Sequence, residues 1–226
     1  MPSSAIKRII YQSLLSILVL TFFIIWAKTD IVGMRTWLKE DGLIENLSSV
    51  FFGLSSIALI IAAKRSSFLK NKSNGLRYFM ILSWALLMFI FMGEEISWGQ
   101  RLFDFNTPES LAEINDQDEF NIHNIEAVDS FMGGKYRYLS IMMITTGLIL
   151  PVIAISERGK KIIQLLAFPV APVSFGILFI GAYIYGKVFP DVTEAREFLL
   201  SVAMLFFSIN GAMHPNDLFR VKKDRD

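Results

Sequence analysis

The run Gly93–Arg101 is the densest group of side chains in the chain that can do acid–base chemistry, with the order Gly-Glu-Glu-Ile-Ser-Trp-Gly-Gln-Arg. It follows directly on an apolar stretch, where each charge costs about 2.5–3.5 kcal/mol at a helix centre and less near the interface. If a helix continues through the run, Glu94, Ser97 and Arg101 share one face, on which a carboxylate and a guanidinium can pair. The run predicts a functional site at a helix end. A solvated interfacial cap with Trp98 at the membrane boundary is the alternative.

Two other apolar stretches begin with carboxylates that we expect at the same membrane boundary. Glu45 stands one turn after Asp41 at the start of the second stretch, and Glu194 stands one turn before Glu197 at the start of the sixth. Glutamates that meet at one boundary cannot all ionise unless a cation is bound or their pKa values are raised. This arrangement is expected of a metal site, a proton-handling site or a general acid–base pair.

His123 lies in the connection that follows the run and would add a nitrogen ligand to these carboxylates. On a helix it would share a face with Glu119 and Glu126, although a solvated or ion-paired histidine fits the same pattern. A site rich in carboxylates with a single histidine suits Mg²⁺, Mn²⁺ or Ca²⁺ better than Zn²⁺. The residues predicted to be catalytic are Glu94, Glu95, Arg101 and His123, and those predicted to bind a cation are Glu45, Glu94, His123 and Glu194.

The amino-acid composition indicates whether these residues belong to a membrane protein or to a water-soluble one. The 226-residue chain is 53% apolar and 19% charged, with 20 phenylalanines, which is more apolar surface than a water-soluble core of this length can bury. The lack of cysteine excludes disulfides, thiolate nucleophiles and Cys-ligated zinc. A formal net charge of +1 argues against nucleic acid as a partner. We therefore predict an integral membrane protein whose partners are membrane lipids.

Six apolar stretches are long enough, or nearly so, to cross about 30 Å of hydrocarbon as helices of about 20 residues. They predict an all-α bundle of six transmembrane helices that forms a single domain over residues 1–226. The predicted spans are 9–27, 43–63, 78–98, 138–155, 163–185 and 198–213, and the long outer connection is 99–137. No clear cleavage site follows the first stretch, so we expect a retained helix and not a signal peptide. Pro169 and Pro172 predict a kink in the fifth span.

The basic residues predict the orientation of these spans. Segment 64–77 has five basic residues and no acidic one, and basic pairs near both chain ends fall on the same side of the membrane. Short basic loops stay in the cytoplasm during insertion, so we expect both termini inside, in the bacterial inner membrane. The run at 93–101 and His123 then lie on the outer side.

The outer connection is too patterned for a disordered linker. The sequence Thr-Pro-Glu at 107–109 predicts a helix start, with the threonine as N-cap. A second set of apolar residues is spaced as the stripe of another short helix: Phe120, Ile122, Ile125 and Val128. We expect two short interfacial helices in this connection.

Three parts of the chain together resemble a group of uncharacterised bacterial multi-pass membrane proteins. They are Gly-Glu-Glu-x-Ser-Trp-Gly-Gln-Arg at 93–101, Thr-Pro-Glu at 107–109 and Asn-x-Gln-x-Glu-x-Asn-x-His-Asn at 115–124. The resemblance covers only residues 93–124. It implies a shared site and a bacterial membrane location but no reaction, because no activity is assigned to the group.

Taken together, these features predict a membrane-embedded enzyme that acts at the outer leaflet on a lipid or lipid-linked substrate. Glu94 and Glu95 would bind metal or act as acid and base. His123 would be a ligand or a proton shuttle, and Arg101 would hold an anionic headgroup. A small ion-coupled transporter whose carboxylates bind a cation is one alternative. A non-catalytic assembly protein whose acidic connection binds another chain is the other.

Overall fold

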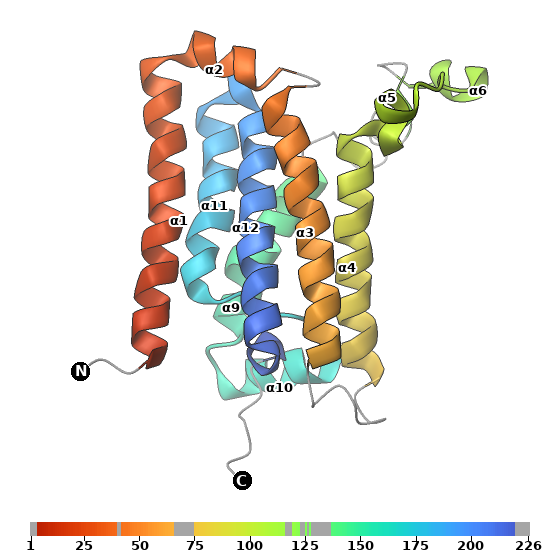
Figure 1. The fold of residues 1–226 in the computed structure, drawn as a ribbon. Coiled ribbons are helices and arrows are strands. Elements are labelled where there is room, and N and C mark those ends of the chain that lie inside the picture. Colours follow the sequence, from red (N-terminus) through yellow and green to blue (C-terminus); the bar gives the residue numbers. More distant parts are fainter. Residues whose placement is uncertain are drawn as a thin grey trace.

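The computed structural model describes residues 4–39, 42–65, 75–115, 119–122, 125, 127 and 137–219, apart from the side chains of Ala5, Arg101 and Asn216. The described residues form helices and turns, with no strand beyond an isolated bridge. Four helices are long and apolar enough to cross a membrane: α1 (Ser4–Thr29), α3 (Leu43–Arg65), α4 (Gly75–Glu95) and α12 (Glu194–Met213). Two shorter apolar segments, Arg137–Ile153 and α11 (Val173–Val188), run beside them (Figure 1).

The two ends of the bundle carry different short elements. We name the end where α1 begins and α12 ends the basal end, and the opposite end, where α4 ends and α12 begins, the apical end (Figure 1). The apical elements are α2 (Ile31–Trp37), η3 (Ser97–Gly99), α5 (Gln100–Phe103), α6 (Glu109–Ala112) and η5 (Pro190–Val192). The basal elements are α10 (Glu157–Leu166) and η6 (Pro215–Phe219).

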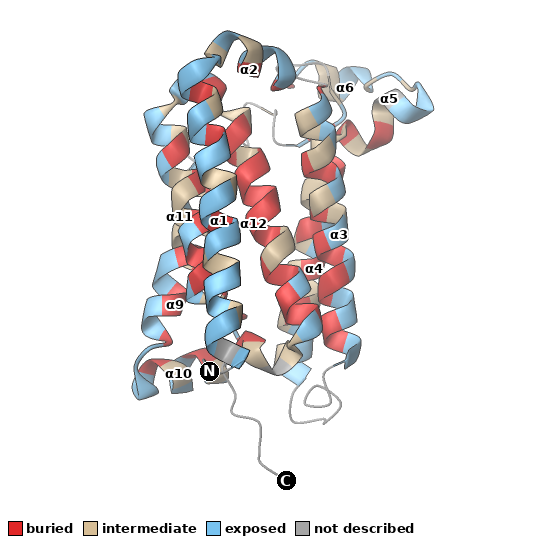
Figure 2. Cartoon of the chain, turned by 60° about the vertical axis from the view of Figure 1, so that its left-hand side comes forward, coloured by how far each residue is buried: buried red, intermediate tan, exposed pale blue. Residues whose placement is uncertain are grey.

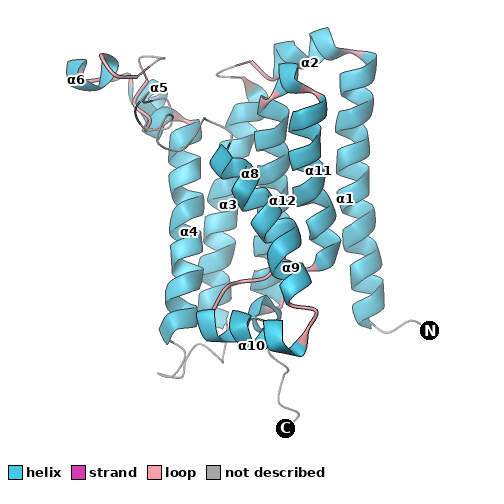
Figure 3. Ribbon diagram, turned by 180° about the vertical axis from the view of Figure 1, so that it is seen from behind, coloured by secondary structure: helices cyan, strands magenta, loops and turns pink. Residues whose placement is uncertain are grey.

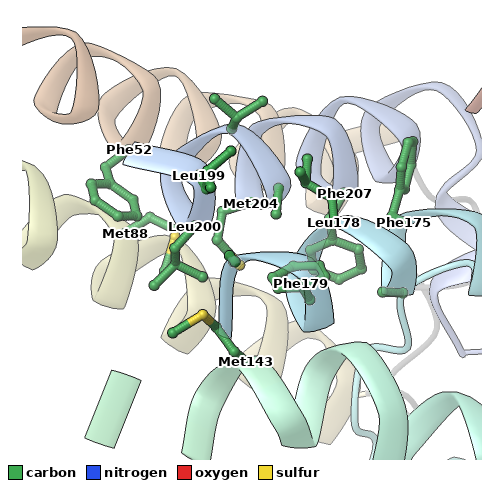
Figure 4. Close-up of a cluster of buried hydrophobic side chains, with 14 of the residues drawn as sticks. Phe52, Met88, Met143, Phe175, Leu178, Phe179, Leu199, Leu200, Met204 and Phe207 are labelled. Atoms are coloured by element: carbon green, nitrogen blue, oxygen red, sulfur yellow. The ribbon is translucent and has the colours of Figure 1, made fainter. Parts of the chain in front are cut away.

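Helix α12 is the central helix of the bundle. Of its most apolar stretch 61% is buried inside the molecule, against 11% for α1, and Figure 2 shows the same contrast between the two helices. Its own Met204 and Phe207 pack against large apolar side chains of the surrounding helices, which include Met88, Met143 and Phe179 (Figure 4). Many outward side chains are apolar too, such as Leu18, which is 68% exposed. An outer surface of this kind suits hydrocarbon better than water.

The segment Arg137–Ile153 contains a widened turn between two α-helical pieces. It consists of α8 (Arg137–Ile144), the π-helical turn η4 (Thr145–Ile149) and α9 (Leu150–Ile153) (Figure 3). Pro151 explains the turn, because its ring would clash with the carbonyl of Gly147 in a regular α-helix. That carbonyl lies against Gly176 of α11, where an added Cβ would be 2.4 Å from its oxygen. Two glycines thus allow the backbones to approach closely.

The prediction of one continuous fifth span over 163–185 is wrong. Helix α10 stops just before Ala167, whose φ of 56° is left-handed, and α11 begins only at Val173. Pro169 and Pro172 stand in the connection between the two helices and kink neither of them. A proline cannot donate a backbone hydrogen bond, so two of them in six residues favour a break.

Among its described residues, the outer connection holds the short helices α5 and α6, and α6 begins within one residue of the start that the sequence predicted. Helix α6 begins at Glu109, and Pro108 occupies the N-cap position that was predicted for Thr107. The predicted apolar stripe is not helical where it is described, because residues 119–122 are irregular and Ile125 pairs in an isolated bridge. The last residue of that stripe lies outside the described residues.

Candidate functional site

Helix α4 ends in a left-handed turn, three residues before its predicted end at Trp98. The φ angles of Ser97, Trp98 and Gly99 are 45°, 53° and 82°. A left-handed residue with a side chain costs about 1–2 kcal/mol, so tertiary contacts must hold Ser97 and Trp98 in place. The shared helical face predicted for Glu94, Ser97 and Arg101 is therefore wrong.

The indole of Trp98 folds back over the last turn of α4. An added Cβ at Gly93 would lie 2.9 Å from the indole ring, and the ring of Phe89 meets it edge-on at 6.1 Å. Trp98 Nε1 donates to Glu94 Oε1 at 2.7 Å, and the backbone N–H of Ile122 donates to Glu94 Oε2 at 2.8 Å. The two oxygens of Glu94 thereby join the turn to the outer connection.

Glu119 makes a second link of the same kind. Its Oε2 accepts from Ser97 Oγ at 2.8 Å and from Asn121 Nδ2 at 2.6 Å. Asn115 Nδ2 in turn donates to Asn121 Oδ1 at 3.0 Å, and the side chains of Ser97, Asn115 and Asn121 are all buried. We name this arrangement the loop clasp: Glu94 and Glu119 with the donors Ser97, Trp98, Asn121 and Ile122.

Gln100 completes the link between the turn and the connection. Its Nε2 donates to Thr107 Oγ1 at 2.9 Å, and its Oε1 accepts from the backbone N–H of Phe120 at 2.7 Å. The polar residues of the motif at 93–124 therefore form many of their hydrogen bonds with one another. Most of the described polar side chains of the motif fold the connection back onto the end of α4.

A second group of polar residues gathers beside the clasp. Tyr138, in the first turn of α8, lies within electrostatic range of the carboxylates of Glu94, Glu95 and Glu197 and of the guanidinium of Arg196. Arg196 Nη2 and Glu197 Oε1 are 3.9 Å apart, and these side chains are only 5% and 14% exposed. We name these five residues the apical cluster. They come from α4, α8 and α12, which are distant in sequence.

Arg196 reaches its position because α11 has a glycine beside it. An added Cβ at Gly186 would lie 2.5 Å from Arg196 Cδ. Carboxylates that share a partly buried site repel one another, and a buried guanidinium next to them offsets part of that repulsion. Arg196 thus places a buried positive charge beside Glu197.

Four of the predicted site residues lie at the apical end. Glu94 and Glu95 belong to the apical cluster. Glu45 and Glu194 stand half-buried in the first turns of α3 and α12. Among the residues described in the structure, no group of three or more histidine, aspartate and glutamate side chains could hold a metal ion.

The other two predicted residues cannot be placed in this arrangement. His123 lies outside the described residues, and of Arg101 only the backbone, in α5, is described. The cation site of four ligands needs His123, so it stays a prediction. The same holds for the catalytic roles of both residues.

Sequence reasoning did not assign a role to Tyr138 or Arg196. Arg196 had a usable signal, because it is the one basic residue within the acidic segment 191–197. Tyr138 had none, since its neighbours come from helices far away in the chain.

Comparison of the chain with protein-family models, with curated proteins and with solved structures found no match.

Proposed function

We propose that the chain is a membrane-embedded enzyme that performs acid–base chemistry on a lipid or lipid-linked substrate at the apical end. The observation that carries this proposal is the apical cluster, where the buried guanidinium of Arg196 lies 3.9 Å from Glu197 Oε1. Tyr138 lies near this pair and near two carboxylates of α4. Like charges held together in a partly buried place perturb each other's protonation, and such groups concentrate at functional sites. The flanks of the same helices are apolar, which suits the acyl chains of a lipid.

Within the cluster, Glu95 and Glu197 take the acid and base roles. Both carboxylate oxygens of Glu94 accept hydrogen bonds, one from Trp98 and one from Ile122. This fits a role in positioning the connection better than a role in proton transfer. Arg196 allows neighbouring carboxylates to ionise together, and Tyr138 provides a hydroxyl that can relay a proton.

Two residues of the outer connection keep the roles proposed from the sequence. His123 is the proton shuttle or a cation ligand, and Arg101 holds the anionic part of the headgroup. A divalent cation such as Mg²⁺, Mn²⁺ or Ca²⁺ would be bound with Glu45 and Glu194. This part of the proposal can fail while the acid–base part stands.

An ion-coupled transporter is less well supported, because an apolar layer lies between the apical cluster and the polar residues nearer the basal end. Near that end, Gln12 donates to Asn210 at 2.9 Å and accepts from Ser174 at 2.7 Å. Between Glu197 and Asn210, the side chains that α12 buries are apolar except for two serines. The largest of the surrounding side chains are drawn in Figure 4.

We also propose that all six apolar segments cross a bacterial inner membrane, with the basal end in the cytoplasm. In support, the basal helix ends carry Lys7, Arg8, Lys64, Arg65 and Arg77, as expected of the side retained during insertion. On this proposal the chain belongs with the bacterial multi-pass proteins that its motif resembles. The apical cluster then faces the outer leaflet.

Lipid turnover by the purified protein tests the proposed activity. The protein is reconstituted into vesicles of phosphatidylethanolamine, phosphatidylglycerol and cardiolipin, or of total bacterial lipid extract, and products are followed by mass spectrometry. Glu95→Gln should lower the rate at least about 100-fold, the usual contribution of a general acid or base. Glu113→Gln, at an exposed position after α6, is the matched control and should keep the wild-type rate.

Two results would refute the proposed enzyme activity. One is that the wild-type protein converts no lipid in either kind of vesicle, and the other is that Glu95→Gln retains the full rate. The cation is tested separately by adding a chelator and then Mg²⁺, Mn²⁺ or Ca²⁺. Turnover that is insensitive to the chelator would remove the cation but leave the acid–base cluster in place.

A further inference from the structure

Helix α10 lies across the basal end of the bundle, at a steep angle to the spanning helices (Figures 1 and 3). Ser156 caps its first turn, because its hydroxyl oxygen accepts from the backbone N–H of Gly159 at 3.0 Å. The corner leading into it is tight, since an added Cβ at Gly159 would lie 1.9 Å from the carbonyl oxygen of Ile153. The direction of α10 is thus determined by local contacts.

The sequence of α10 divides it into two faces. The polar residues repeat at i, i+3, i+4 and i+7, and they are Glu157, Lys160, Lys161 and Gln164. The same spacing on the opposite face gives Gly159, Ile162, Ile163 and Leu166. Arg158 and Leu165 stand at the boundary between the two faces. This is the pattern of an amphipathic helix.

The bundle covers only part of the apolar face. Ile163 is buried in a small cluster with Leu150, Ala154 and Val170, and this contact attaches α10 to the rest of the molecule. By contrast, Ile162, Leu165 and Leu166 are 53%, 75% and 48% exposed. Three large exposed apolar side chains at this end of the bundle are more stable in an apolar environment than in water.

We propose that α10 lies in the membrane interface at the basal end and binds anionic phospholipid headgroups there. Its exposed apolar side chains insert at the boundary of the acyl chains, and its basic side chains contact lipid phosphates. Charge complementarity selects this partner, because α10 has three basic residues against one acidic residue, and Lys160 already pairs with that acid, Glu157. Further basic residues stand at the same end: Arg8, Lys64, Arg65 and Arg77.

The depth of α10 can be measured directly, because the chain contains no cysteine and single labels can be introduced without background. Spin labels are attached to Ile162→Cys, Leu166→Cys and Lys161→Cys in reconstituted full-length protein. Ile17→Cys, on the exposed side of α1, gives the value for a side chain in lipid. Labels at 162 and 166 should favour collision with oxygen over a water-soluble nickel chelate, and the label at 161 should show the reverse. Equal nickel accessibility at all three positions would overturn the interfacial placement.

Lipid selectivity is tested with spin-labelled phosphatidylglycerol and phosphatidylcholine in the same vesicles. The triple variant Arg158→Gln/Lys160→Gln/Lys161→Gln should lose most of the preference for phosphatidylglycerol. Each basic residue at an anionic surface contributes about fivefold to that preference. The matched control, Lys28→Gln/Lys39→Gln/Lys187→Gln, removes the same charge at the apical end and should keep the preference. An equal loss in both variants, or no loss in either, would refute headgroup binding by α10. Neither experiment depends on the enzyme activity.

Discussion

Replacing Glu119 with alanine should release the left-handed turn at Ser97 and Trp98. The Glu119 carboxylate holds the Ser97 hydroxyl at 2.8 Å, and the indole N–H of Trp98 is held by Glu94 at 2.7 Å. These two bonds are the hydrogen bonds to carboxylates that oppose the backbone strain of the turn. The Glu119→Ala variant removes one of them and leaves the strain unchanged.

The magnitudes favour release of the turn. Two left-handed residues with side chains cost about 2–4 kcal/mol together. Two hydrogen bonds to carboxylates contribute about 1.5–3 kcal/mol each, or about 3–6 kcal/mol together. Without Glu119, about 1.5–3 kcal/mol remains, which no longer exceeds the strain of Ser97 and Trp98. The native turn should then lose its dominance over relaxed conformations.

Fluorescence of Trp98 reports this change. The other tryptophans are first replaced, as Trp26→Phe, Trp37→Phe and Trp84→Phe. In that background, Glu119→Ala should shift the emission to longer wavelength and increase quenching by acrylamide, because the indole leaves its position over Gly93. Glu119→Gln should keep the native emission, since its amide oxygen can accept the same bonds. Glu113→Ala, in the same connection, is the matched control.

A second substitution tests whether strain is the cause. In Glu119→Ala/Ser97→Gly, the glycine removes about 1–2 kcal/mol of strain, so the bond between Trp98 and Glu94 is again sufficient to hold the turn. The double variant should recover much of the native emission. Unchanged emission in Glu119→Ala, or a double variant as shifted as the single one, would refute the reasoning.

Two glycine substitutions give further predictions, with Gly75→Ala as their shared control because an added Cβ there meets nothing within 4 Å. Gly176→Ala should lower the thermal midpoint in detergent, with a loss of about 1–3 kcal/mol, because its Cβ would lie 2.4 Å from the rigid carbonyl oxygen of Gly147. A midpoint equal to that of the control would contradict the close contact. The atoms nearest to an added Cβ at Gly186 belong to the flexible side chain of Arg196, so Gly186→Ala should lower lipid turnover with little change in midpoint. Full lipid turnover in Gly186→Ala would show that Arg196 does not contribute to the proposed site.

The long spans were predictable because hydrophobicity alone determines them. The second span was predicted at 43–63 and α3 covers Leu43–Arg65, while the sixth was predicted at 198–213 and α12 ends at Met213. The fifth span failed for a local reason. Apolar content continued through 163–185, but the two prolines and left-handed Ala167 allowed the chain to turn from α10 into α11. The average hydrophobicity of a stretch does not show where the backbone changes direction within it.

The candidate site was predictable in its position but not in its composition. Glu94 and Glu95 marked the right helix end from sequence. The left-handed turn could not be foreseen, since Ser97 and Trp98 adopt it only because contacts from a distant segment hold them. Tyr138 was missed because it comes near the carboxylates only in the folded chain, in which α8 packs against α11.

The spacing of the motif now has a physical explanation. As the chain advances from Glu94 to Gln100, its partners Ile122, Glu119 and Phe120 belong to one short segment that returns across it. The motif carboxylates at 94 and 119 therefore mainly build the connection, whereas Glu95 contributes its charge to the apical cluster. Substitution of Glu95 should therefore lower turnover at least about 100-fold and leave the Trp98 emission native, whereas substitution of Glu119 should alter that emission first.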